Sequence, residues 1–143
     1  MTINEAQDEI IEEFCMFDDW MERYQLLVDY GRELKKNPFP EADKTDTNKI
    51  DGCQSTVWFT ARYDDGKIYY NGDSEAQLVK GIVALLLHVL SGHTPQEILN
   101  AELYFIDRIG LSEHLSPTRS NGLLAMLRQM KMYALAFQAK ANG

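Results

Sequence analysis

Apolar residues recur at helical spacing near the start of the chain, with acidic residues on the opposite face. This apolar stripe contains Ile10, Phe14, Phe17, Met21, Tyr24 and Val28. Asp18-Asp19 interrupts the pattern, and Asp19 followed by Glu22 has the form of a capping box. The sequence therefore predicts two helices, over residues 5–17 and 20–34. Pro38 and Pro40 end the second one because each proline disfavours helical geometry in the residue before it.

A strand pattern follows a polar linker. Residues 56–63 are rich in β-branched and aromatic side chains, the composition of a half-buried strand. Asp65-Gly66 is a turn pair, and residues 68–71 form the next strand. Residues 48–50 are expected to pair with residues 56–62 as a short edge strand. The result is a small antiparallel sheet of about three strands, with helices covering one face.

Helical signals return after the second predicted strand. Ser74, with Gln77 three residues later, is expected to cap a helix that runs to about Leu90. Gly81 lowers the helix propensity by about 1 kcal/mol relative to Ala, so we expect it to allow close packing against the sheet.

Two further start signals divide the rest of the chain. Thr94-Pro95 opens a short helix, and Ser116-Pro117 opens the last one. The last helix has an apolar stripe of Leu123, Leu127, Met130, Ala134 and Phe137. Residues 103–109 fit no single pattern, and residues 111–114 form a turn or short helix. The chain is thus predicted to be one α+β domain over residues 1–143.

The charge balance excludes some partners. The 22 acidic and 14 basic side chains give a formal net charge of -8, whereas nucleic-acid binding needs clustered Lys and Arg. Residues 1–13 carry five acidic residues and no basic one, which is unlike a secretory or transit peptide. The longest apolar run, residues 82–90, is shorter than the roughly 20 residues that a membrane span needs. We therefore expect a cytoplasmic protein that binds neither nucleic acid nor membranes.

Two cysteines, Cys15 and Cys53, are too few for a disulfide scaffold and lack the spacing of a zinc or cluster site. No metal site is predicted, and in a reducing compartment both are expected to be thiols. Cys15 lies between Phe14 and Met16 on the first predicted helix. Its favoured interpretation is that of a packing residue.

Cys53 lies at or beside the tip of a turn, because Asp51-Gly52 favours chain reversal. Gly52 before it and Gln54-Ser55 after it leave backbone amides free to approach an anion or a sulfur leaving group. The alternative is a small buried hydrophobe, the usual role of a free cysteine. Spacing alone leaves both interpretations open.

Several blocks of the sequence resemble the SufE-type sulfur-acceptor family, which includes CsdE. The first block is Gly52-Cys53-Gln54-Ser55 followed by Val57-Trp58. Later blocks match in the same order: Gly72-Asp73-Ser74, Lys80-Gly81 with the apolar run after it, Thr94-Pro95, Gly110-Leu111, His114-Leu115-Ser116-Pro117, Arg119 and Asn121-Gly122-Leu123. The resemblance runs from about Trp20 to the last helix, and it is specific because separate blocks match together.

The resemblance implies a SufE/IscU-like fold and a role for Cys53 as the catalytic acceptor of persulfide sulfur. The donor would be a SufS/CsdA-like cysteine desulfurase, which this chain would stimulate. Pyridoxal phosphate would belong to that partner, and this chain would hold no cofactor. The sulfur would pass to iron-sulfur cluster assembly, with a cluster scaffold as a candidate recipient. Gly52, Gln54, Ser55 and Asp73 would support the site or bind the partner.

Arg119 has two interpretations. It lies in the first turn of the last helix, where the macrodipole disfavours a cation, so another group should hold it there. One interpretation is a structural ion pair with a carboxylate. The other follows from the resemblance, since residues 116–119 match a family block, and has Arg119 facing the Cys53 turn or the partner.

Other functions remain open at this point. The chain could be an iron-sulfur scaffold, a non-catalytic protein that docks on the desulfurase, or a cysteine hydrolase that uses one of its three histidines. Whether a sulfur carrier of this kind counts as an enzyme is also open, because it acts as a transpersulfidation partner. The expected state is a monomer or weak homodimer.

Overall fold

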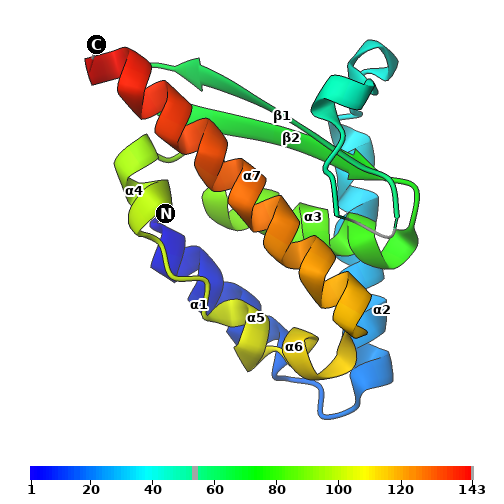
Figure 1. Cartoon of the computed structure of the whole chain (residues 1–143). Coiled ribbons are helices and arrows are strands. Elements are labelled where there is room, and N and C mark those ends of the chain that lie inside the picture. Colours follow the sequence, from blue (N-terminus) through cyan, green and yellow to red (C-terminus); the bar gives the residue numbers. More distant parts are fainter. Residues whose placement is uncertain (53–54, 143) are drawn as a thin grey trace.

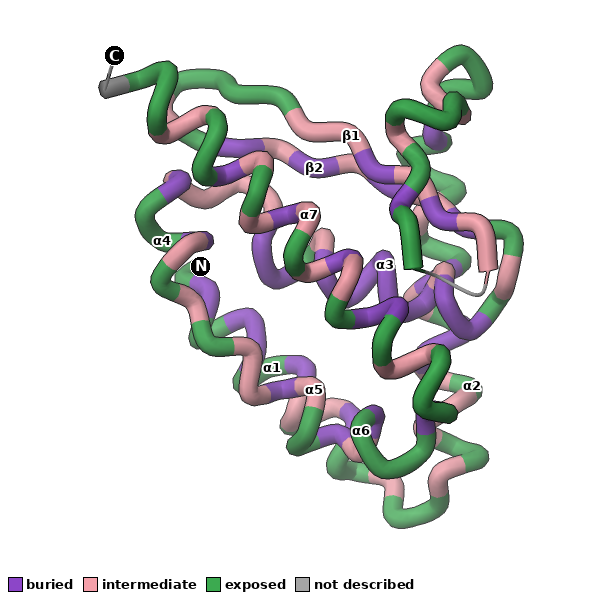
Figure 2. Tube along the Cα trace, in the orientation of Figure 1, coloured by how far each residue is buried: buried purple, intermediate pink, exposed green. Residues whose placement is uncertain are grey.

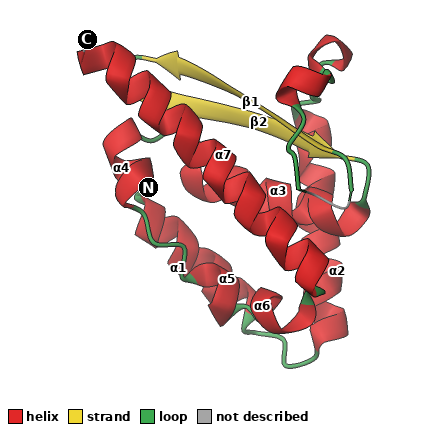
Figure 3. Cartoon of the chain, viewed as in Figure 1, coloured by secondary structure: helices red, strands yellow, loops and turns green. Residues whose placement is uncertain are grey.

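Helices and one antiparallel hairpin make up the fold, in a computed structural model that describes residues 1–52 and 55–142 (Figure 1). The α-helices and strands are, in order, α1 Ile3–Phe14, α2 Trp20–Arg32, β1 Val57–Asp64, β2 Lys67–Ser74, α3 Gln77–Leu90, α4 Pro95–Asn100, α5 Phe105–Arg108, α6 Leu111–His114 and α7 Pro117–Asn142. Short 3-10 turns, η1 Glu33–Lys36, η2 Glu41–Asp43 and η3 Asp46–Asn48, connect α2 to the sheet (Figure 3). The predicted α+β class is confirmed.

The sheet is a two-stranded hairpin. β1 pairs with β2 from Val57 opposite Ser74 to Asp64 opposite Lys67. Asp65 and Gly66, with φ of 50° and 80°, close the hairpin as the turn pair predicts. The predicted third strand over residues 48–50 is wrong, because η3 coils the chain before it and leaves a single bridge between Lys49 and Trp58.

The crossing of α2 and α3 forms a dense part of the core. α3 is buried along most of its length (Figure 2). A Cβ added to Gly81 would lie 2.8 Å from the carbonyl carbon of Leu27 on α2 and closer still to its oxygen. One added to Gly31 would lie 3.0 Å from the backbone nitrogen of Gly81. Gly81 therefore packs closely as predicted, but against α2 and not against the sheet.

Helices α3 and α7 cover the same face of the sheet. The buried Tyr70 of β2 donates its hydroxyl to the Met130 carbonyl oxygen of α7 at 2.6 Å. A Cβ at Gly72 would meet Val83 of α3 at 3.0 Å. The opposite, outer face carries the half-buried and exposed side chains of Trp58, Thr60, Arg62, Tyr69, Asn71 and Asp73. This alternation places one set of side chains in the core and the other toward solvent.

Helices α2, α4 and α7 begin where the local sequence signals predict. Thr94 and Glu97 form the reciprocal capping box of α4 with Pro95 at its first position, and α7 begins at Pro117 as predicted. Asp19 caps α2 by accepting from the Met21 backbone N–H at 3.1 Å.

The predicted cap of α3 is wrong. This helix begins at Gln77 after Ala76, without a side-chain cap bond. The buried Ser74 instead donates its hydroxyl to the Thr56 carbonyl oxygen at 2.8 Å. The same hydroxyl oxygen accepts from the Ala76 backbone N–H at 3.3 Å, outside the first turn of the helix, so Ser74 joins the two strand ends and does not cap α3. In the described part of the chain, no helix combines the length and apolar character needed to cross a membrane.

Candidate functional site

The predicted acceptor Cys53 and its neighbour Gln54 lie outside the described residues, so the site is built from what surrounds them. On the incoming side, the buried Ile50 donates its backbone N–H to the Val57 carbonyl oxygen at 2.9 Å. Gly52 has a φ of 91°, and a Cβ there would lie 3.6 Å from Cβ of Ala125 on α7. The chain thus enters the acceptor segment on a left-handed glycine beside α7.

On the outgoing side, the chain is bound to the junction of β2 and α3. The Thr56 carbonyl oxygen accepts from the Ser74 hydroxyl at 2.8 Å and from the Glu75 backbone N–H at 3.4 Å. Ser55, the first described residue after the gap, is half-buried, and Val57 is fully buried. Both ends of the segment that carries Cys53 are therefore anchored to the sheet.

Asp73 joins three segments next to this anchor. It lies opposite Trp58 in the hairpin, and its carboxylate accepts from the Ser74 backbone N–H at 2.8 Å. Lys80 of α3 lies 3.3 Å from the carboxylate, and Lys44 lies 3.6 Å from it. We call Asp73, Lys44, Lys80 and Trp58 the Asp73 corner. The predicted partner-binding role of Asp73 stays a prediction, and the structure adds an internal role.

Lys44 fixes the linker over the outer face of the sheet. Its Nζ lies 5.4 Å from the centroid of the Trp58 ring and 2.8 Å from a carboxylate oxygen of Glu41. The hydrogen bond to Glu41, together with the nearby carboxylate of Asp73, raises the pKa of Lys44. The sequence contains no signal for this contact, because Lys44 belongs to a polar linker without periodicity.

Arg119 lies on α7 without the ion pair that one interpretation required. Its backbone N–H donates to the Ser116 hydroxyl at 3.3 Å, and its side chain is half-buried. Within residues 1–52 and 55–142, no carboxylate oxygen lies within 4.0 Å of its guanidinium. Ala125, which borders Gly52, is about 9 Å further along the same helix.

Cys15 corrects a prediction. It is exposed at the end of α1, with Sγ 3.7 Å from the Arg108 carbonyl oxygen, and is not a packing residue of the core. The helix ends at Phe14, three residues earlier than predicted, so Cys15 leaves the buried face.

The three histidines lie in separate places. His88 is exposed on α3, and His114 stacks on Trp20 with ring centroids 4.1 Å apart. His93 is half-buried in the loop between α3 and α4, with Nδ1 3.8 Å from Oε2 of Glu97. Burial lowers the pKa of His93. Among the described residues, no group of three or more His, Cys, Asp and Glu side chains could hold a metal ion.

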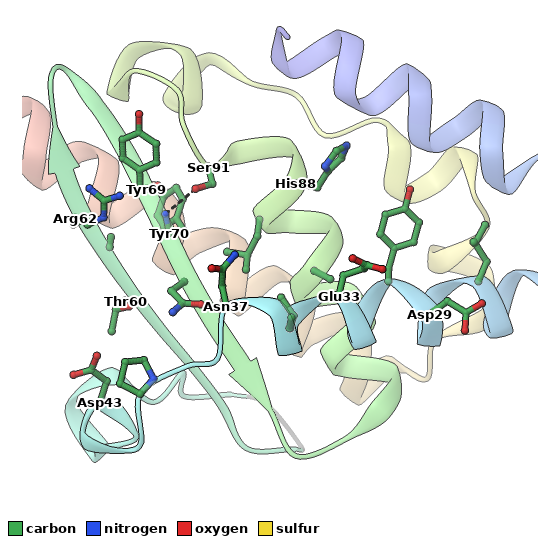
Figure 4. A pocket seen from close by; sticks show the side chains of 18 of the residues that line it. Asp29, Glu33, Asn37, Asp43, Thr60, Arg62, Tyr69, Tyr70, His88 and Ser91 are labelled. Carbon is green, nitrogen blue, oxygen red and sulfur yellow. Dashed lines mark hydrogen bonds between the residues drawn. The ribbon is translucent and has the colours of Figure 1, made fainter.

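A groove of about 1110 Å³ opens on the other side of the molecule, between α2, α3 and the outer face of the sheet (Figure 4). Asp29 of α2 and Glu33 of η1 line one wall. Arg62 lines the sheet wall and is stacked on Tyr69, with 4.5 Å between Cζ and the ring centroid. None of the described residues predicted for the acceptor site is in its lining.

The fold and the glycine turn define a small α+β protein in which a left-handed Gly52 beside α7 precedes Cys53 in the sequence. Residues 8–134 match the family model described as SufE, Fe-S metabolism associated domain. The chain belongs to the SufE family, and its predicted family resemblance is confirmed.

Named relatives agree with this assignment. The chain is 45% identical over 129 residues to an uncharacterized SufE-like protein of Synechocystis, covering 90% of this chain and 80% of that protein. It is 38% identical over 132 residues to one from Rhizobium meliloti, covering 89% and 93%. The SufE-like protein 1, chloroplastic/mitochondrial, of Arabidopsis thaliana is 39% identical over 135 residues, which cover 94% of this chain and 36% of that protein.

The fold also has a solved counterpart. The solution structure of a hypothetical protein from Thermus thermophilus matches with a TM-score of 0.74 at 24% identity, covering 92% of this chain and 94% of that one. This likeness supports the fold. The family description associates the chain with Fe-S metabolism.

Proposed function

We propose that the protein takes persulfide sulfur from a cysteine desulfurase onto Cys53, stimulates that enzyme, and passes the sulfur to iron-sulfur cluster assembly. The observation that carries the proposal is the left-handed Gly52 immediately before Cys53, beside α7, in a chain of the SufE family. A glycine turn lets a thiol approach a second protein closely. The protein is proposed to act in the cytoplasm, as a monomer or weak homodimer, and without a cofactor of its own.

The transfer is a thiol-persulfide exchange. The Cys53 thiolate attacks the outer sulfur of the desulfurase cysteine persulfide, a new S–S bond forms, and the old S–S bond breaks. The desulfurase cysteine leaves as a thiolate, so the step needs no oxidant or reductant. An ordinary thiol has a pKa of about 8.5, so only a few per cent is thiolate at neutral pH. Activation is therefore proposed to occur mainly in the desulfurase site, with pyridoxal phosphate supplied by that enzyme.

The neighbouring residues have proposed supporting roles. Gly52 permits the turn, and the backbone amides of Gln54 and Ser55 are proposed to face the sulfur during transfer. Arg119 is proposed to face the turn or the desulfurase, which its lack of a carboxylate partner among the described residues supports. Asp73 is proposed to hold the base of the turn through Lys44 and Lys80.

The test is mass analysis of the intact protein after incubation with a cysteine desulfurase, pyridoxal phosphate and cysteine. We expect a gain of whole sulfur atoms, removed by a reductant, in the wild type and in Cys15→Ser, but not in Cys53→Ser. Cys15→Ser is the matched control because Cys15 is the other cysteine of the chain and its thiol is exposed. A gain that persists in Cys53→Ser would overturn the assignment of the acceptor.

A second readout separates sulfur transfer from simple docking. Desulfurase turnover is measured with the wild type and with Cys53→Ser. We expect the stimulation to disappear with Cys53→Ser, because the persulfide then has no acceptor. Full stimulation by Cys53→Ser would contradict the proposal and indicate that binding alone modulates the enzyme.

A further inference from the structure

A second groove, of about 550 Å³, lies between α7 and the segment that contains α5 and α6. Its α7 wall runs from Ser120 to Lys131, and its other wall contains residues 101–107 with Ser112 and Leu115. The apolar side chains that line it include Leu103, Ile106, Leu115, Leu123, Leu124 and Leu127. No described residue of the proposed acceptor site lies in this lining, so the groove is a separate feature.

Two exposed leucines lie on α7, one in the lining of the groove and one beyond it. Leu124 is 56% exposed and Leu135 is 57% exposed. They are eleven residues apart, about three turns, and so lie on the same side of α7. Arg128 and Lys131 lie between them on that side, so the apolar contact surface is the groove itself together with Leu124 at its edge.

The two walls of this groove carry opposite charges. Arg128 and Lys131 lie on the α7 wall, and Glu102 and Asp107 lie on the other wall. Lys131 extends across one end of the groove and donates its ammonium to the Ala101 carbonyl oxygen of the opposite wall at 3.1 Å. Arg128 is exposed, and in the described part of the chain no carboxylate oxygen lies within 4.0 Å of it. The positive charge of the α7 wall is opposite in sign to the formal net charge of the whole chain, which is -8.

We propose that this groove binds an amphipathic α-helix of a partner protein, with acidic residues flanking its apolar stripe on the side that faces α7 and basic residues on the other side. The α7 wall from Ser120 to Lys131 spans about 16 Å, which matches three turns of such a helix. The acidic flank of such a helix would face the positive charges of the α7 wall, and its basic flank would face the negative charges of the other wall, so the groove favours this partner. A second copy of the chain is the competing occupant, and the sedimentation experiment below tests it. The proposal does not depend on the role of Cys53.

The test uses three synthetic helical peptides with one shared leucine stripe. One has Glu along one flank and Lys along the other, one has Lys on both flanks, and one has Glu on both. We expect the split-charge peptide to bind at least about fivefold more tightly than either other peptide, measured by fluorescence anisotropy at physiological salt. If the peptide with Lys on both flanks binds most tightly, the net charge of the whole protein governs binding and the proposal is wrong.

Variants of the full chain locate the site. Leu124→Ser and Arg128→Glu change exposed residues, and we expect each to weaken binding of the split-charge peptide at least about fivefold. Met21→Ser, which changes a residue 67% exposed on α2, is the control and should leave binding unchanged. Equal affinities for Leu124→Ser and Met21→Ser would overturn the proposal. So would sedimentation that shows a dimer of the chain alone and its loss in Leu124→Ser, because the occupant would then be a second copy.

Discussion

At the crossing of α2 and α3, glycines bring two backbones into contact, whereas at the Asp73 corner charged side chains join three segments. The crossing is buried and leaves no room for a single methyl group at Gly81. The Asp73 corner consists of side chains that are partly exposed, 16% for Asp73, 24% for Lys44 and 30% for Lys80. Packed backbones resist any change of shape, while partly solvated ion pairs contribute little and can rearrange.

We infer that the crossing of α2 and α3 stabilises the fold, whereas the Asp73 corner can change its shape. The crossing belongs to the main core, and the Asp73 corner lies beside the ends of the segment that carries Cys53. Binding segments are usually drawn from the less stable parts of a fold. The predictions below test whether the two regions differ in this way.

The largest effect is expected for Gly81→Ala. The new methyl group would overlap the Leu27 carbonyl group, and only movement of α2 away from α3 can relieve this overlap. We expect a loss of about 3 kcal/mol in the free energy of unfolding, despite the better helix propensity of Ala. Urea denaturation followed by circular dichroism measures it.

Gly66→Ala is the matched control for that variant. Gly66 has a φ of 80°, but a Cβ there meets nothing within 4 Å. Its loss should be limited to backbone strain of about 1 kcal/mol. If both variants lose the same stability, the crossing is not the rigid contact described above.

The next largest effect is expected at Tyr70, which forms a buried hydrogen bond between uncharged groups. Tyr70→Phe removes the hydroxyl that Tyr70 donates to the Met130 carbonyl oxygen, and it leaves the ring in place. We expect a loss of about 1 to 2 kcal/mol that does not change with salt, because the bond is shielded from solvent. A strong salt dependence in urea denaturation would contradict this assignment.

The contrast also shows which features the sequence could predict. The capping box of Thr94 and Glu97 and the turn at Asp65-Gly66 follow from residues that contact near neighbours, and both predictions are confirmed. Gly81 predicts close packing, but its partner on α2 is more than 50 positions away in sequence and could not be identified from the sequence alone. Ser74 has the local form of a cap, yet a contact across the strands determines its role.

The candidate site also has one part that the sequence predicts and another that it does not. Cys53 and Gly52 follow from a short motif, and the positive φ of Gly52 agrees with the predicted turn. Lys44 and Lys80 meet at Asp73, and Ala125 borders Gly52, and these three residues come from different segments of the chain. No spacing rule joins them, so only the folded chain reveals these contacts.

Asp73→Asn tests the Asp73 corner. The amide retains an acceptor for the Ser74 backbone N–H but loses both lysine ion pairs, so we expect a loss below about 1 kcal/mol that shrinks at high salt. The alkylation rate of Cys53, measured in a Cys15→Ser background, should change at least about twofold, because the residues that anchor the segment carrying Cys53 would be held less firmly. Asp64→Asn, which removes an exposed ion pair with Arg62 at the far end of the hairpin, is the control. Equal alkylation rates for the two variants would show that the corner does not position the turn.

The smallest effect concerns pH and lies outside both regions, at His93. Burial lowers the pKa of His93 in the folded protein, although Glu97 opposes this shift. Below the unfolded value of about 6.5 the unfolded chain therefore binds a proton that the folded chain binds less readily, and stability falls as the pH decreases. His93→Gln should reduce the decline in unfolding free energy between about pH 7.5 and 5.5 by less than about 1 kcal/mol, since the side chain is only partly buried. His88→Gln, which removes an exposed histidine from α3, is the control, and an equal reduction in both variants would show that burial of His93 is not the cause.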